Sequence, residues 1–189
     1  LNILNLLGRA AANVVNPGLL MDIFSFDEFI KYIRGQSSLF DGREVMNFRP
    51  GEDIFSQGEV SPDIFVVTEG LVKLHYVTID GKEWIKSFIM DKGMLGSRAS
   101  QSLGQPSTFS ATCLEDCVIH SIPYKAFETL CAEDPTLAAM AFQFFQWLGL
   151  KKELREHQLL CLSAEERYRN FLNENPELAG RITQVDMAR

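Results

Sequence analysis

The sequence lacks an excess of basic residues. Its 18 Lys and Arg stand against 25 Asp and Glu, which gives a formal net charge of -7. Such a chain has no overall electrostatic attraction to nucleic acid. A local basic helix that reads DNA is still compatible with this balance, because such helices are small parts of a larger surface. The 46% hydrophobic and 23% charged residues, over 189 positions, indicate a globular protein with a sizeable core.

Clustered cysteine and histidine are also missing. No CxxC pair occurs among the four cysteines, which are Cys113, Cys117, Cys131 and Cys161. We interpret them as buried, reduced thiols of a cytosolic protein; the alternative, a metal or iron–sulfur site, would need clustered thiolates. The three histidines, His75, His120 and His157, are far apart, and we expect them on strand and helix surfaces. We therefore expect no metal.

Long apolar runs are absent as well. None reaches the roughly 20 residues that a membrane-spanning helix requires, so we expect no membrane contact and a cytoplasmic location. Residues 1–20 lack the charged start and long apolar middle of a secretion signal, and Pro17-Gly18 interrupts them. We interpret residues 1–20 as an N-terminal extension that is either added to the natural chain or poorly tied to the fold.

The patterns that are present predict an α+β protein. Residues 23–33 carry apolar side chains at helical spacing and predict a short amphipathic helix. From residue 43 to 122, short alternating runs are interrupted by glycine, proline and aspartate. Asp80-Gly81 between two such runs predicts a β-hairpin with a type I′ turn. Many short strands at this spacing predict an antiparallel β-roll of the jelly-roll type.

Helical patterns follow Pro123. A short helix is expected over residues 124–131, and Asp134-Pro135 begins a longer one that reaches about residue 162. This helix would be about 40 Å long. Because apolar residues occupy more than one of its faces, one face can pack on its own domain and another on a twin helix in a homodimer. The residues assigned to this dimer helix are Leu137, Ala141, Phe144 and Leu148. The alternative is a helix buried within a single chain.

The last part of the sequence predicts small helices. Ser163 and Glu166 have the spacing of a capping box, and the helix that they begin should end before Pro176. Residues 183–186 predict the start of another helix, inside which the sequence ends, so we expect a further part of the protein beyond residue 189. The predicted division is therefore residues 1–20, an extension; 21–132, the β-roll; 133–162, the long helix; and 163–189, the beginning of a C-terminal domain.

Several stretches carry a resemblance to a known family. Residues 48–59, FRPGEDIFSQGE, and residues 64–74, IFVVTEGLVKL, resemble two successive motifs of cyclic-nucleotide-binding domains. Residues 183–188, TQVDMA, resemble the start of a winged helix-turn-helix domain. Together with the long helix between them, these stretches resemble the Crp/Fnr family of transcription regulators. The resemblance implies an effector-sensing roll, a homodimer, and binding to double-stranded DNA through the part that follows residue 189.

The resemblance also implies where an effector would bind. Cyclic-nucleotide binders hold the ribose with a Glu after a Gly, and the phosphate with an Arg about ten residues later. The corresponding positions here are Gly96, Ser97, Arg98, Ser107 and Thr108, so serines replace both the Glu and the Arg. We therefore expect neither cyclic AMP nor cyclic GMP to bind, and the effector, a small molecule if there is one, stays unidentified.

Two alternatives remain open at these positions. Arg98 could supply the missing cation for a phosphate or another anion, or it could be an ordinary surface or salt-bridged residue. Ser97, Ser107 and Thr108 could bind a smaller polar ligand, or nearby backbone could satisfy them.

Two functions agree with these predictions. The first is a DNA-binding transcription regulator of which this chain is the effector-sensing and dimerising portion. The alternative is a stand-alone sensor or scaffold that acts on a protein partner through a degenerate roll. An enzyme is not expected, because the sequence shows no nucleophile–base pair and no paired carboxylates at suggestive spacing.

Overall fold

The computed structural model describes residues 24–40, 43–178 and 180–183. Among these, a roll unit contains residues 26–139 and 177–183, and a helical unit contains residues 24–25 and 140–176. The long helix α5 (Pro135–Cys161) contributes to both units. The extension predicted at residues 1–20 lies outside the described residues, as does all of the helix predicted at residues 183–189 except Thr183.

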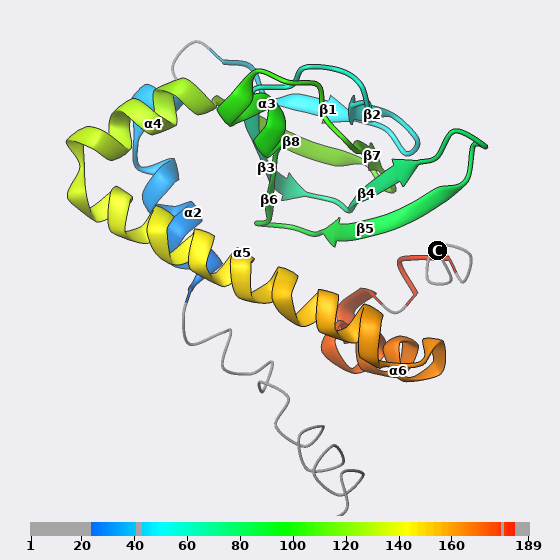
Figure 1. Cartoon of the computed structure of the whole chain (residues 1–189). Coiled ribbons are helices and arrows are strands. Elements are labelled where there is room, and N and C mark those ends of the chain that lie inside the picture. The colour runs from blue at the N-terminus through cyan, green and yellow to red at the C-terminus, as the bar shows by residue number, and fades with distance from the viewer. Residues whose placement is uncertain (1–23, 41–42, 179, 184–189) are drawn as a thin grey trace, which may run out of the picture. The chain divides into compact units, whose positions relative to one another are not determined.

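The roll consists of two four-stranded sheets, as the alternating runs predict (Figure 1). In spatial order, the first sheet contains β1 (Met46–Phe48), β8 (Cys117–Pro123), β3 (Asp63–Glu69) and β6 (Met94–Leu95). The second contains β2 (Asp53–Phe55), β7 (Ser110–Cys113), β4 (Val72–Val77) and β5 (Glu83–Ile89). All neighbouring strands are antiparallel, which confirms the predicted roll.

The core of the roll lies between the two sheets. Alternate residues of a strand point to the same face, so each sheet contributes every second side chain. The buried residues of this core are Phe55, Phe65, Val67, Val72, Leu74, Leu95, Phe109, Ala111, Cys113, Cys117 and Ile119. All four cysteines are free thiols, and Cys113 and Cys117 are core residues, as predicted. The prediction of buried thiols is wrong for Cys161, which is exposed near the end of α5, and Cys131 is only partly buried.

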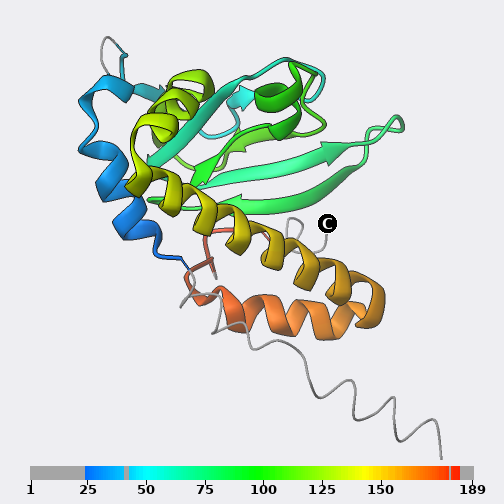
Figure 2. The same ribbon diagram turned by 60° about the vertical axis from the view of Figure 1, so that its left-hand side comes forward.

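The β4–β5 hairpin extends from the roll and is seen along its length in Figure 2. Val77 pairs with Glu83, so residues 78–82 form the loop, and Thr78 N donates to Lys82 O at 2.9 Å. The hairpin confirms the prediction from Asp80-Gly81, but the predicted type I′ turn is wrong. That turn needs positive φ at both central residues, and only Gly81 has it, at 78°. The longer loop lets Asp80 keep an ordinary backbone conformation.

Helices α2 (Phe26–Arg34) and α4 (Tyr124–Glu133) belong to the roll unit, and both are close to the predicted ranges. Phe29 of α2 is fully buried and meets Phe127 of α4 edge to face, with 6.4 Å between the ring centroids. Tyr32 donates from its hydroxyl to Asp134 Oδ2 at 2.7 Å. A short 3-10 helix, η2 (Ser37–Leu39), follows α2.

Helix α5 begins where Asp134-Pro135 predicts. Asp134 Oδ1 accepts from the backbone N of Thr136 at 2.9 Å and of Leu137 at 3.2 Å, which satisfies free amides of the first turn. In the helical unit, Phe144 packs against Phe24 at 5.4 Å and Trp147 at 6.1 Å between ring centroids.

Helix α6 (Ala164–Glu174) also begins as the sequence predicts. Its N-terminus has the predicted capping box, because Glu166 N donates to Ser163 Oγ and Ser163 N donates to Glu166 Oε2. The short 3-10 helix η3 (Pro176–Leu178) follows α6, so the helix does end before Pro176.

Candidate functional site

The candidate effector segment begins at Gly96, directly after β6. The six-residue helix α3 (Arg98–Leu103) starts two residues later and packs closely on the first sheet. A Cβ on Gly96 would lie 2.3 Å from Gln101 Nε2 and 3.0 Å from the carbonyl oxygen of Asp63. Gln101 Nε2 donates to that same carbonyl at 3.0 Å. A side chain at residue 96 would therefore displace the Gln101 amide from the carbonyl of Asp63.

Ser97 caps α3. Its side chain is almost completely buried, and its Oγ accepts from the backbone N of Ser100 at 3.4 Å. In the chain without a ligand, the hydroxyl of Ser97 thus bonds to nearby backbone, one of the two alternatives that the sequence leaves open. A further contact of Ser97 to an effector stays a prediction.

Arg98 is the first residue of α3, so its segment is helical rather than extended. The side chain is exposed, and Nη1 donates to the hydroxyl of Tyr124 at 3.2 Å. The guanidinium carbon also lies 5.3 Å from the centre of the Tyr124 ring, within range of a cation–π contact. Arg98 therefore contacts α4, and its role as a substitute cation for an anion stays a prediction.

Ser107 is the residue that the family resemblance aligns with a phosphate-binding Arg, and this alignment stays a prediction. Ser107 is buried, and its Oγ donates to the carbonyl of Phe109 at 2.8 Å. Its backbone pairs with the loop after β2: Ser107 N donates to Glu59 O at 2.7 Å, and Gly58 N donates to Ser107 O at 2.8 Å. Thr108 is exposed. In the sequence, residues 96–98 thus stand at the N-terminus of α3, and residues 107–108 follow a few residues after its end.

Lys86 is a residue of this region that the sequence analysis missed. Its Nζ lies 4.0 Å from the centre of the buried Phe109 ring, two residues from Ser107. A cation therefore comes close to the turn that contains Ser107. Simple alternation cannot predict this placement, because the β4–β5 register shifts between Leu74 and His75. The bulge changes which side chains of β5 share a face.

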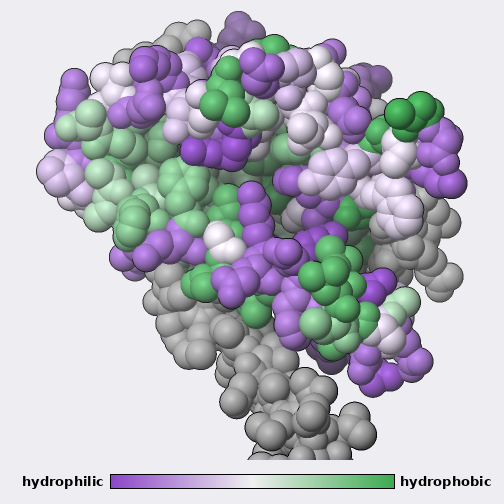
Figure 3. Space-filling view, viewed as in Figure 1, coloured by the Kyte–Doolittle hydropathy of each residue, from purple (hydrophilic) through white to green (hydrophobic). Residues whose placement is uncertain are grey.

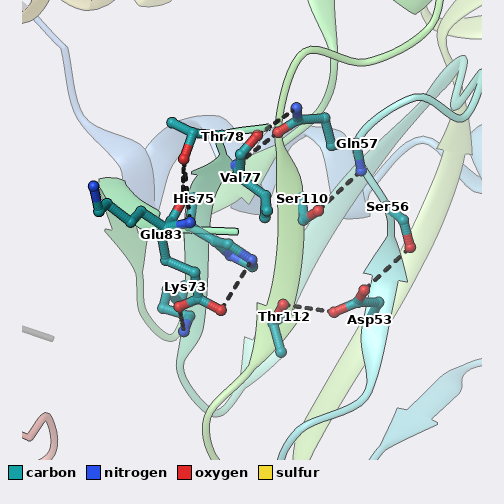
Figure 4. A network of polar contacts seen from close by, with 11 residues as sticks. Asp53, Ser56, Gln57, Lys73, His75, Val77, Thr78, Glu83, Ser110 and Thr112 are labelled. Atoms are coloured by element: carbon teal, nitrogen blue, oxygen red, sulfur yellow. Dashed lines mark hydrogen bonds and ion pairs between the residues drawn. The ribbon is translucent and has the colours of Figure 1, made fainter. Parts of the chain in front are cut away.

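A second group of polar residues covers the sheet formed by β2, β7, β4 and β5 (Figure 4). We call Asp53, Lys73, His75, Glu83, Ser110 and Thr112 the polar cluster. Lys73 Nζ donates to Glu83 Oε2 at 3.0 Å, and His75 Nε2 lies 3.9 Å from Glu83 Oε1. Thr112 donates to Asp53 at 2.5 Å, and the backbone N of Gln57 donates to Ser110 Oγ at 2.9 Å.

His75 corrects one sequence prediction. It was expected on a strand surface, but only 5% of it is exposed, because β4 is covered on both of its faces over residues 72–75. Its Nδ1 is buried and has no hydrogen-bond partner in the part of the chain that the structure describes. Burial, and then the charge of Lys73, hold the pKa of His75 below its usual value of 6.5. His75 is therefore neutral at pH 7.

Two further observations concern metal sites and membrane-spanning helices. Over residues 24–40, 43–178 and 180–183, no three His, Cys, Asp or Glu side chains gather in a way that could hold a metal ion. Within the same residues, no helix is both long and apolar enough to cross a membrane.

Comparison with known proteins gives one domain match and a consistent set of relatives. Residues 45–134 match the cyclic nucleotide-binding domain. The chain is 26% identical over 156 residues to the transcriptional activator protein Anr of Pseudomonas aeruginosa, covering 80% of this chain and 56% of that protein. It is 25% identical over 148 residues to the nitrogen fixation regulation protein FixK of Azorhizobium caulinodans, covering 75% of this chain and 57% of that protein.

Solved structures support the same fold. The structure of FixK2 from Bradyrhizobium japonicum matches with a TM-score of 0.62 at 20% identity, covering 76% of this chain and 74% of that one. The catabolite activator protein of Thermus thermophilus matches with a TM-score of 0.54 at 19% identity, covering 81% and 65% of the two chains. The chain spans a little over half the length of the two curated relatives named above.

Proposed function

We propose that the chain, which matches the cyclic nucleotide-binding domain and is similar to regulators of the Crp/Fnr family, is the effector-sensing and dimerising portion of a DNA-binding transcription regulator in the cytoplasm. The observation that carries this proposal is the order of parts in one chain. A roll of the cyclic-nucleotide-binding type is followed by the 27-residue helix α5 and then by the capped helix α6.

The proposal includes an effector site that does not take cyclic nucleotides. Because serine is uncharged, neither Ser97 nor Ser107 supplies the positive charge that a phosphodiester needs, and both hydroxyls are buried and hydrogen-bonded to neighbouring backbone. Loss of one charge-assisted Arg–phosphate pair costs about 2–5 kcal/mol of binding free energy. Calorimetric titration of the chain with cyclic AMP and cyclic GMP should therefore give no saturable heat. Saturable binding would mean that another cation, with Lys86 and Arg98 the first to replace, holds the phosphate.

The proposal also includes a homodimer formed by α5. Leu137 and Ala141, from the predicted dimer residues, are buried within the single chain, so they act as core residues here. A different face of α5 is exposed: Phe142 is 63% and Leu160 is 78% exposed, and they lie five turns apart on one face. Figure 3 shows apolar surface over the first half of α5 and again near its end.

A glycine on the same face supports a helix partner. Gly149 lies about two turns after Phe142, and a Cβ on it would meet no atom within 4 Å. Glycine within a helix costs about 1 kcal/mol relative to alanine, and close approach of a second helix would account for it. We expect the chain to sediment as a dimer and Phe142→Glu to sediment as a monomer. Leu103→Glu, on exposed α3, is the matched control and should stay dimeric.

DNA binding is tested with the complete gene product. A symmetric dimer should protect two half-sites whose centres are about 34 Å apart, in DNA from the promoter region of its own gene. If the complete product protects no DNA, the stand-alone sensor or scaffold replaces the regulator as the function.

A further inference from the structure

A bidentate ion pair fixes the chain after α6. Arg181 Nε donates to Glu115 Oε1 at 3.0 Å, and Arg181 Nη2 donates to Glu115 Oε2 at 2.7 Å. The planar guanidinium and carboxylate thus meet through two parallel hydrogen bonds, the strongest arrangement for this pair of side chains. These bonds lower the pKa of Glu115 from its usual value and raise that of Arg181, so both groups are charged at neutral pH.

Apolar side chains accompany the ion pair. Leu178 is 2% exposed and Ile182 is 8% exposed, and both belong to the compact unit that contains the roll. Arg181 N donates to Leu178 O at 3.0 Å, which closes a turn between the two buried residues. Docking of this segment therefore combines hydrophobic burial with an ion pair, whereas an isolated exposed ion pair contributes little.

The turn that carries Glu115 is held firmly on the roll. It joins β7 to β8, and Leu114 N donates to the carbonyl of Leu71 at 2.7 Å. The thiol of Cys117 donates to the carbonyl of Glu115 at 3.3 Å. The amide of Leu114 and the carbonyl of Glu115 are thus hydrogen-bonded within the roll, independently of the contact with Arg181. The backbone that carries the Glu115 side chain is therefore anchored to the roll.

We propose that Glu115, Leu178, Arg181 and Ile182 form a latch that anchors the segment after α6 to the roll. The chain leaves the roll unit within α5, after Ala139, and returns to it after Pro176. The latch lies directly after this return. It makes the β7–β8 turn an element that positions residues 180–183.

The latch is a property of this chain, and its regulatory meaning rests on the proposed function. Residues 183–188 resemble the start of a helix-turn-helix domain, so the latch precedes the DNA-binding part of a complete regulator. If an effector moved the β7–β8 turn, the Glu115–Arg181 contact would transmit that movement to the start of the DNA-binding part. The latch would thus couple the sensing roll to DNA binding through a contact with two states, docked and released.

Amide hydrogen exchange of the 189-residue chain tests the latch. Glu115→Gln keeps the shape of the side chain and removes its charge. We expect exchange of the amides of residues 180–183 to rise about 3- to 10-fold, the effect of losing one partly exposed bidentate pair. Amides of β3 and β8 should keep their protection. Glu165→Gln, which removes the exposed ion pair with Arg169 at 2.8 Å, is the matched control and should leave residues 180–183 unchanged.

A charge exchange separates a latch from general loss of stability. The double variant Glu115→Arg with Arg181→Glu should restore much of the protection that Glu115→Gln loses. Unchanged exchange in Glu115→Gln overturns the latch. Equal acceleration in β3, β8 and residues 180–183, without restoration in the double variant, also overturns it. Because this readout involves no DNA, a failure of the latch and a failure of the proposed function are recognised separately.

Discussion

Replacing Gly70 by alanine tests how the two sheets of the roll close on each other. Gly70 connects β3 to β4 with φ at 106°, a conformation that alanine adopts at a cost of about 1–2 kcal/mol. An added Cβ would lie 2.5 Å from Cys117 Sγ and 2.6 Å from the carbonyl oxygen of Asp116. The second contact is with backbone, so relieving the overlap would require movement of the β7–β8 turn, at about 1–3 kcal/mol more.

The two costs can be separated with a second glycine. Gly58 also has positive φ, at 92°, but a Cβ on it would meet nothing within 4 Å. Gly58→Ala should therefore lower the free energy of unfolding by the conformational cost alone, about 1–2 kcal/mol. Gly70→Ala should lower it by about 2–5 kcal/mol, measured by urea unfolding followed with circular dichroism. Equal losses in the two variants would refute the close contact of Gly70 with the turn.

Two further predictions concern a titrating side chain and a helix cap. Since the pKa of His75 is lowered in the fold, the unfolded chain takes up a proton on His75 first as the pH falls. The contribution of His75 to the free energy of unfolding should therefore fall as the pH drops below about 6.5 and should be constant above it. His120 is shifted in the same direction, so His75→Gln should reduce the pH dependence of the urea midpoint without abolishing it; an unchanged slope would contradict the burial of His75. Ser163→Ala removes one half of the capping box and should destabilise α6 by about 1 kcal/mol, seen as faster amide exchange within α6, whereas Ser163→Asp should preserve protection.

Much of the fold follows from local sequence. Asp134-Pro135 and the Ser163–Glu166 pair identify where α5 and α6 begin, because each provides the cap that the free amides of a first turn need. The strands follow from alternation and from the glycines between them. Asp80-Gly81 predicts the hairpin but not its loop, because sequence does not show that Thr78 and Lys82 close a longer turn.

The candidate site is harder to predict than the fold. The family resemblance singles out Gly96 and Ser107 as site residues. The structure shows the local contacts of each, and their role in binding an effector stays a prediction. Lys86 was missed because a bulge, not alternation, decides which way its side chain points. His75 was misplaced because burial of both faces of β4 depends on neighbours distant in sequence. Glu115 and Arg181 are 66 positions apart in the sequence, and no local sequence pattern predicts their contact.

The most direct test of a regulator with a disabled cyclic-nucleotide site is one measurement of DNA affinity. The complete gene product is titrated onto DNA from its own promoter region at a fixed, stated salt concentration, with and without a large excess of cyclic AMP over protein. We predict saturable, sequence-specific binding with the same dissociation constant in both titrations. Binding that appears only with cyclic AMP would contradict the disabled site, and absence of specific binding in both would contradict the regulator.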